Sequence, residues 1–147
     1  MITAAASLFL VLGLQDVSPT VKFSVDPVKK DDATGTLTVT LPEGWHAYQN
    51  PPKSEFENPL TLLSKTKGFV FKKISYPAGK PMTSFGTDTL VYEGEVKIPF
   101  TAKIAKAIKP KDGVYTFLLD VSYQVCNEST CKPPSSIRTK VSFKVGK

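Results

Sequence analysis

Hydrophobic and polar residues alternate in short runs along most of the chain. The first run is Val21–Val25, and the second is Leu37–Leu41, after a turn that we place at residues 31–35. A period of two is typical of strands with one buried face, so both runs predict strands. The clearest run covers residues 114–125, where every second residue is aromatic or aliphatic and would point to one side of a strand.

The rest of the chain alternates between hydrophobic segments and segments rich in Pro, Gly and polar residues. The latter predict loops at residues 49–59 and 77–87 and a turn at residues 109–113. Gly94 and Pro99 mark bends or an edge within a hydrophobic segment. Further strands are expected at residues 45–48, 60–64, 68–76, 90–104 and 141–145. About eight strands without a sustained helical period predict an all-β fold, an immunoglobulin-like antiparallel β-sandwich.

Residues 1–14 form a long hydrophobic stretch, MITAAASLFLVLGL. It is shorter than the roughly 20 residues of a spanning helix, so we expect no stable membrane insertion. No basic residue precedes it and no clear cleavage site follows, so a buried first strand or the end of a longer signal are alternatives. We favour a signal peptide or disordered N-terminus at residues 1–17 and one domain at residues 18–147. Export would place the domain in a compartment where disulfides persist.

The charge of the chain constrains its partners. The 147 residues include 19 basic and 13 acidic side chains, which give a formal net charge of +6. The lysines are scattered, and Arg138 is the only arginine that could bind a phosphate or a base in a bidentate manner. We therefore expect a solvated basic surface and no nucleic-acid partner.

The two cysteines of the chain are Cys126 and Cys131. If the strand at residues 114–125 keeps its phase, Cys126 lies on the polar face with Asp120 and Gln124, where an accessible thiol can react. Residues five apart lie opposite each other across a four-residue hairpin loop, so the two thiols can form a disulfide. A ring this small adds only about 2 kcal/mol as a structural link.

Face and spacing leave two uses of this pair open: a redox-active disulfide that exchanges with partners, or a structural hairpin disulfide. Copper(I) bound to the two thiols is a third alternative, with weaker support because His46, the only histidine, would be the only further ligand of that kind. We expect no other cofactor. A nucleophilic Cys–His enzyme would need His46 beside a thiol, and we expect His46 to be structural.

Four segments give the chain a resemblance to the DsbD family, specifically to the N-terminal periplasmic domains of these bacterial thiol:disulfide interchange proteins. The similarity extends over about residues 20–145, and the segment around the cysteines is its most specific part. The segments are Gly44–Tyr48 (GWHAY), Tyr76–Pro77 (YP), Tyr92–Gly94 (YEG) and Tyr123–Pro134 (YQVCNESTCKPP).

The resemblance implies an immunoglobulin-like fold in which Cys126 and Cys131 are the redox-active, catalytic pair. It implies that Cys131 forms the mixed disulfide with partners and that Cys126 resolves it. It also implies a mobile aromatic cap over the cysteines, with Phe85 at the position of the cap, and Tyr48 at the rim of the site. Phe85 could equally be an ordinary loop residue, and Tyr48 a core residue.

By the same resemblance, the domain relays reducing equivalents from a thioredoxin-like donor to periplasmic acceptors, such as disulfide isomerases and thioredoxins of cytochrome c maturation. It would be a component of a protein-disulfide reductase system. We expect the chain to be a monomer that stays in the periplasm or is otherwise exported. The sequence shows neither a membrane domain nor a thioredoxin-like C-x-x-C domain, so we expect a fragment or a free-standing version whose donor binds in trans. The alternative function is a non-catalytic β-sandwich that binds a protein or carbohydrate partner and has a structural disulfide.

Overall fold

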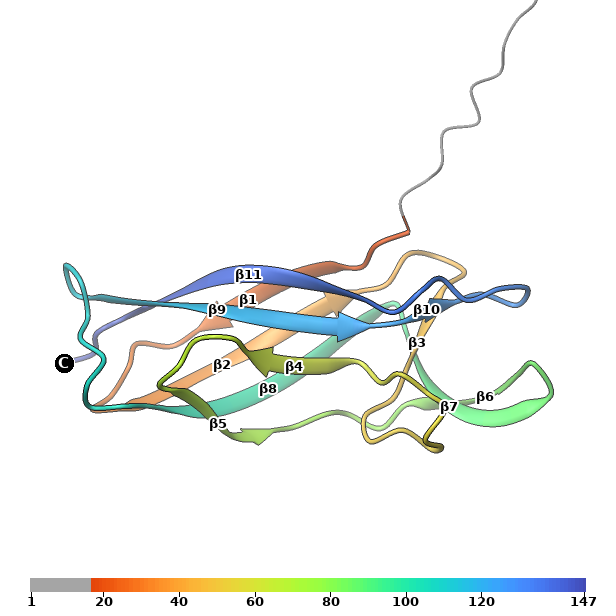
Figure 1. Cartoon of the computed structure of the whole chain (residues 1–147), viewed down its shortest axis with the longest axis horizontal. Helices are drawn as coiled ribbons and strands as arrows, with labels where there is room; N and C mark the ends of the chain where they lie inside the picture. The colour runs from red at the N-terminus through yellow and green to blue at the C-terminus, as the bar shows by residue number, and fades with distance from the viewer. Residues whose placement is uncertain (1–16) are drawn as a thin grey trace, which may run out of the picture.

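The computed structural model describes residues 17–147, and this range contains eleven strands and no helix (Figure 1). All named strand pairs are antiparallel, and they form three sheets with the strand orders β1-β2-β8-β5, β11-β9-β4 and β10-β3-β7-β6. The strands are β1 Thr20–Val25, β2 Asp32–Thr40, β3 His46–Tyr48, β4 Thr61–Ser64, β5 Phe69–Ile74, β6 Lys80–Ser84, β7 Thr87–Glu93, β8 Glu95–Ile104, β9 Val114–Tyr123, β10 Val125–Cys126 and β11 Ser135–Lys144.

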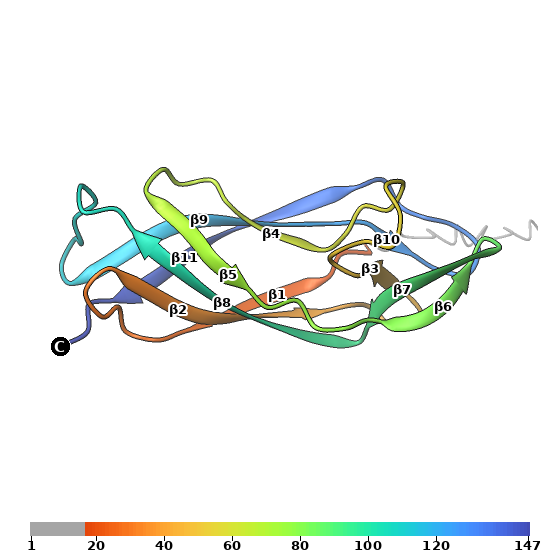
Figure 2. The same ribbon diagram turned by 90° about the horizontal axis from the view of Figure 1, so that it is seen from below.

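Two of the sheets pack face to face, with β11, β9 and β4 in one layer and β1, β2, β8 and β5 in the other (Figures 1 and 2). Alternate residues of β9 enter the core between them, where Phe117, Leu119 and Val121 are at most 1% exposed. Phe69 of β5 and Phe143 of β11 pack against Phe117 from both layers. The predicted immunoglobulin-like β-sandwich is therefore confirmed, and it is built from the alternation that the sequence shows.

The third sheet, β10-β3-β7-β6, lies at one end of the sandwich, opposite the end at which the C-terminus lies (Figure 1). One face of this end sheet contributes Ala47, Tyr92 and Val125 to the core. Gly94, at φ 63°, is the single residue between β7 and β8, and it passes the chain from the end sheet to the sandwich. The side chains on the other face of the end sheet are therefore free to form a separate site.

The segment at residues 77–87, predicted as a loop, is largely a hairpin of β6 and β7. The two strands pair from Lys80 to Ser84, and the turn is made by Phe85 and Gly86, with φ angles of 51° and 77°. Positive φ at both turn residues matches the twist of a tight hairpin. Pro81 fits in β6 because this is an edge strand, whose outer N–H groups need no partner.

The turn placed at residues 31–35 is also wrong, because β2 already begins at Asp32. The chain reverses at residues 29–32 instead, where Lys30 has a φ of 58°. Gly35 lies within β2 and not in a turn. A Cβ atom at this position would lie 2.8 Å from the ring of Phe100. The glycine is required by close packing. Eleven strands form where about eight were expected because β6 is added, residues 90–104 are divided between β7 and β8, and β10 is separate from β9.

Residues 1–16 lie outside the described part of the chain, so the expected signal peptide is not addressed by the structure. Across residues 17–147, no helix has the length and hydrophobicity needed to cross a membrane.

Candidate functional site

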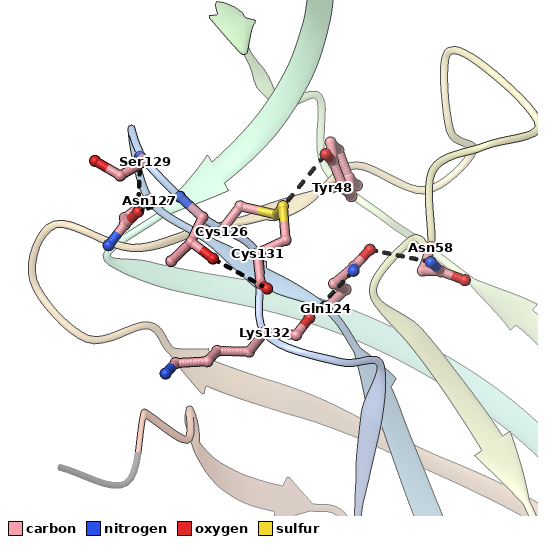
Figure 3. The surroundings of a disulfide bond; sticks show 9 residues. Tyr48, Asn58, Gln124, Cys126, Asn127, Ser129, Cys131 and Lys132 are labelled. Atoms are coloured by element: carbon pink, nitrogen blue, oxygen red, sulfur yellow. Dashed lines mark hydrogen bonds between the residues drawn. A yellow bond between two sulfur atoms is a disulfide. The ribbon is translucent and has the colours of Figure 1, made fainter. Parts of the chain in front are cut away.

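The cysteine pair lies in the end sheet, at the point where the chain leaves the sandwich. After β9 ends at Tyr123, Gln124 interrupts the strand, and β10 then pairs with β3. Cys126 and Cys131 lie opposite each other across a short loop and form a disulfide with an S–S distance of 2.04 Å (Figure 3). The hairpin register that their spacing predicts is the one that the structure adopts.

The four residues between the cysteines are held by the Asn127 side chain. Its Oδ1 accepts hydrogen bonds from the backbone N–H groups of Ser129 and Thr130, both at 2.8 Å. The Asn127 N–H donates to the Thr130 carbonyl oxygen, also at 2.8 Å. An Asx-type turn of this kind uses the side chain in place of a backbone acceptor. The loop is therefore ordered by its own sequence, and it keeps the two sulfur atoms together.

The two cysteines differ in burial, which contradicts the expectation that Cys126 is accessible. Cys126 is fully buried, whereas Cys131 is partly exposed. The prediction that Cys126 lies on a polar, accessible face was wrong for two reasons. The interruption at Gln124 moves Cys126 from the sandwich into the end sheet, and Asp120 is buried in an ion pair with Arg138 at 2.8 Å. Cys131 is thus the cysteine nearer the surface, and Cys126 is shielded.

Tyr48, at the end of β3, lies beside the buried sulfur. Its hydroxyl oxygen is 3.8 Å from Cys126 Sγ (Figure 3). Burial raises the pKa of the Tyr48 phenol, and the nearby carboxylate of Glu57 raises it further, while a hydrogen bond with Ser84 acts in the opposite direction. The phenol therefore remains protonated and can donate a hydrogen bond to sulfur.

His46, which we expect from the sequence to be structural, lies on β3, an inner strand of the end sheet. Cys126 lies directly opposite it on β10, and Glu93 lies directly opposite it on β7. The side chain is 4% exposed, and its Nε2 atom is buried without a hydrogen-bond partner. Burial lowers the pKa of His46, and Glu93 partly offsets this effect. Strand register, which a sequence pattern does not display, brings these residues together.

Phe85 lies at the tip of the β6–β7 hairpin and is 60% exposed. It lines an open hollow of about 660 Å³ together with His46, Glu93 and Glu128. It also lines a smaller hollow that includes Tyr48 and the exposed ring of Phe56. Neither cysteine lines these two hollows. The structure thus places Phe85 at the same end of the molecule as the disulfide, and its role as a cap remains a prediction.

Metal binding was one of the alternatives for the cysteine pair. Within residues 17–147, no three His, Cys, Asp or Glu side chains are grouped in a way that could hold a metal ion.

Comparisons with known proteins agree with the fold. Residues 14–142 match the family "Thiol:disulfide interchange protein DsbD, N-terminal". The solved N-terminal periplasmic domain of ScsB from Proteus mirabilis is similar, with a TM-score of 0.57 and 19% identity over 85% of this chain. This chain spans only 44% of that structure, and the likeness at such identity shows the fold alone.

A second solved structure, the collagen-binding subdomain of the Enterococcus faecalis surface protein ACE, has 14% identity and a TM-score of 0.32. That match covers 88% of this chain and 98% of the other. A score this low carries no argument about fold or function. No curated protein matches the chain.

Proposed function

Because the chain belongs to the family of DsbD N-terminal domains, we propose that it relays reducing equivalents between a thioredoxin-like donor and acceptor proteins in the periplasm. Cys126 and Cys131 are the exchanging pair. The observation that carries this proposal is their unequal burial, with a shielded Cys126 and a partly exposed Cys131. Thiol–disulfide exchange needs one sulfur that a partner can reach and a second that attacks only within the molecule.

The exchange has two halves. In the first, a donor thiolate attacks Cys131 Sγ, the Cys126–Cys131 bond breaks, and Cys126 leaves as a thiolate that takes up a proton. The second donor thiol then attacks the mixed disulfide and releases the reduced domain. In the second half, the Cys131 thiolate attacks an acceptor disulfide, and Cys126 then attacks Cys131 Sγ. The domain disulfide is restored, and the acceptor leaves as a dithiol.

The end of the sandwich offers a docking surface for such partners. Cys131 is followed by exposed Pro133 and Pro134, which have no N–H groups to donate to a further strand. Phe56 and Phe85, which are 87% and 60% exposed, flank the hollow beside Tyr48. Exposed aromatic side chains at one site are typical of protein interfaces. The periplasmic location is supported by the description of the ScsB structure as a periplasmic domain.

In this proposal Phe85 acts as a cap that shields the cysteines when no partner is bound, and Tyr48 forms part of the rim. The position of Phe85 on a two-residue turn at the tip of a hairpin supports the assignment, because such a tip can move without disturbing the core. Reduced Phe85→Ala protein should therefore oxidise in air faster than reduced native protein. Equal oxidation rates would remove the argument for a cap.

The proposal is tested by equilibrating the protein in graded glutathione buffers and trapping its thiols. A reduction potential of about −120 to −270 mV, the range of known relay proteins, is expected. A value below about −300 mV would make the bond structural and favour the alternative of a protein-binding β-sandwich. In a matched pair of variants, the reduced Cys126→Ser protein should accumulate a mixed disulfide between Cys131 and an oxidised thioredoxin probe. Cys131→Ser, whose remaining thiol is buried, should accumulate far less.

A further inference from the structure

The row Cys126, His46 and Glu93 crosses three adjacent strands of the end sheet, with Cys126 and His46 buried and Glu93 exposed at its outer end. His46 is paired with Cys126 on one side and with Glu93 on the other. Directly opposite residues of an antiparallel pair have Cβ atoms about 4.5–5.5 Å apart and point to the same face. The imidazole of His46 is thus within side-chain reach of the buried sulfur, on the face of the sheet that does not enter the core.

The Nε2 atom of His46 is a buried nitrogen without a hydrogen-bond partner. An unsatisfied polar atom in the interior costs free energy, roughly 1–3 kcal/mol, so its presence calls for an explanation. Replacement of the imidazole by a hydrocarbon side chain would remove this cost. A nitrogen kept unpaired beside a reactive sulfur is explained if it is needed as a proton acceptor during part of the reaction.

The exchange described above creates that need at Cys126. When Cys126 attacks Cys131, it must lose its proton, yet an apolar interior raises the pKa of a thiol and disfavours the thiolate. The neighbouring Tyr48 phenol is protonated and serves as a donor. The buried Asp120 carboxylate is engaged by Arg138. Among the described residues at this site, His46 is the buried group with a side-chain nitrogen that has no hydrogen-bond partner, and this nitrogen accepts a proton when the other ring nitrogen carries the imidazole hydrogen.

We propose that His46 accepts the proton of the Cys126 thiol as Cys126 attacks Cys131 Sγ, an inference that rests on the proposed exchange function. The Cys126 S–H bond breaks, a Cys126–Cys131 bond forms, and the partner sulfur leaves as a thiolate. The proton moves to His46 and from there to solvent through the hollow that His46 lines. In the reverse direction, protonated His46 returns a proton to Cys126 as it leaves.

The protonation state of His46 is set by the groups that surround it. Cys126 faces it from β10 and Glu93 from β7, Tyr48 shares β3, and Glu43 and Glu128 line the same hollow from two loops. Burial lowers the pKa of His46, so the imidazole is neutral near neutral pH and can accept a proton. Glu93 acts in the opposite direction and moves the onset of this activity to higher pH.

The test uses the full reduced chain and dithiobisnitrobenzoate, an aromatic disulfide whose released thiolate absorbs visible light. Cys131 attacks the reagent and releases the first aromatic thiolate in a concentration-dependent phase. Cys126 then resolves the mixed disulfide and releases the second in a phase that is independent of reagent concentration. In His46→Gln, which keeps an acceptor oxygen but cannot take up a proton, we expect an unchanged first phase and a second phase slowed about 100-fold near neutral pH. His46→Phe, which restores a ring of similar size, should behave alike.

The pH profile separates a proton acceptor from a structural role. In the native protein, the second phase should rise with pH and level off above the pKa of His46. In His46→Gln it should continue to rise and approach the native rate in alkali, where hydroxide deprotonates the thiol. Glu93→Gln should move the native plateau to lower pH, whereas Glu95→Gln, which removes the same charge from β8, should leave it in place.

The outcomes distinguish the role of His46 from the exchange function on which it rests. A second phase of native rate in His46→Gln across the pH range would overturn the role of His46 and leave the exchange function intact. Equal slowing of both phases, or slowing that does not depend on pH, would also overturn it, because a damaged fold affects both thiols. A native protein without a second phase would instead refute the exchange function on which the inference rests.

Discussion

Phe117 lies at the centre of the aromatic cluster that joins the two layers of the sandwich. The ring is 1% exposed, and its centroid lies 4.5 Å from that of Phe69, 6.0 Å from that of Phe143 and 6.2 Å from that of Tyr115. Phe117→Ala removes the ring and all three aromatic contacts. Its aromatic neighbours lie on β5, β9 and β11, and each of these strands is held by backbone pairing within its sheet. We therefore expect the backbone to close only part of the resulting cavity.

The expected loss of stability follows from these contacts. A buried Phe→Ala substitution costs about 3–5 kcal/mol, and aromatic pairs contribute about 0.5–1.5 kcal/mol each beyond the area they bury. Three lost pairs place Phe117→Ala near the upper end, at about 5 kcal/mol. With a urea dependence of about 2 kcal/mol per molar, the unfolding midpoint of the oxidised protein should fall by roughly 2.5 M. Phe56→Ala, which truncates a ring that is 87% exposed, is the matched control and should change stability by less than about 0.5 kcal/mol.

Two results would refute this reasoning. A loss below about 2 kcal/mol would mean that the strands collapse around the vacated volume, and that the cluster is not a rigid part of the core. A changed reduction potential in folded Phe117→Ala protein would mean that the sandwich and the end sheet are energetically coupled. We expect no change, because Phe117 lies in the sandwich and both cysteines lie at the end sheet.

Three further predictions concern polar contacts. The Arg138 guanidinium holds the pKa of the buried Asp120 carboxyl below its ordinary value, so their pairing stabilises the fold above about pH 4, and this contribution is lost as pH falls. The urea midpoints of native and Arg138→Gln protein should therefore differ most near neutral pH and converge in acid. A difference that does not change with pH would contradict the assignment. Tyr92→Phe removes a hydroxyl that donates to the Pro77 carbonyl oxygen at 2.8 Å and should cost about 1–3 kcal/mol in urea unfolding; an unchanged midpoint would show that water replaces the bond. Asn127→Ala frees the loop between the cysteines in the reduced state, so the disulfide should form less readily. The reduction potential should rise by about 30 mV for each tenfold loss in the equilibrium constant of ring closure. A potential equal to that of native protein would show that the loop is ordered by other groups.

The sandwich could be predicted from the sequence because its strands have one buried face. β9 illustrates this, since the alternate residues from Phe117 to Tyr123 enter the core as their pattern indicates. The β6–β7 hairpin could not be predicted in the same way. Its turn has Phe85 in place of the Asn or Asp that is typical before Gly, and Pro81 in β6 resembles a loop signal until the strand is known to lie at an edge.

The candidate site was partly visible in the sequence. The spacing of Cys126 and Cys131 fixes their hairpin register, because it is a local property of six residues. The face of Cys126 and the neighbourhood of His46 depend instead on which strands pair across the molecule. A single interruption at Gln124 changes the sheet to which Cys126 belongs, and the pairing of β10 with β3 then brings His46 opposite it. Local alternation carries no information about either event.

The transfer of the chain from β9 to β10 at Gln124 also separates the chemistry of the domain from its architecture. The ring closed by the disulfide begins and ends beyond β9, and the ten-residue pairing of β9 with β11 is made without it. Opening the ring therefore releases a short peripheral turn and leaves the main ladders intact. In the proposed exchange cycle, the disulfide can therefore open and close while the sandwich keeps the same fold.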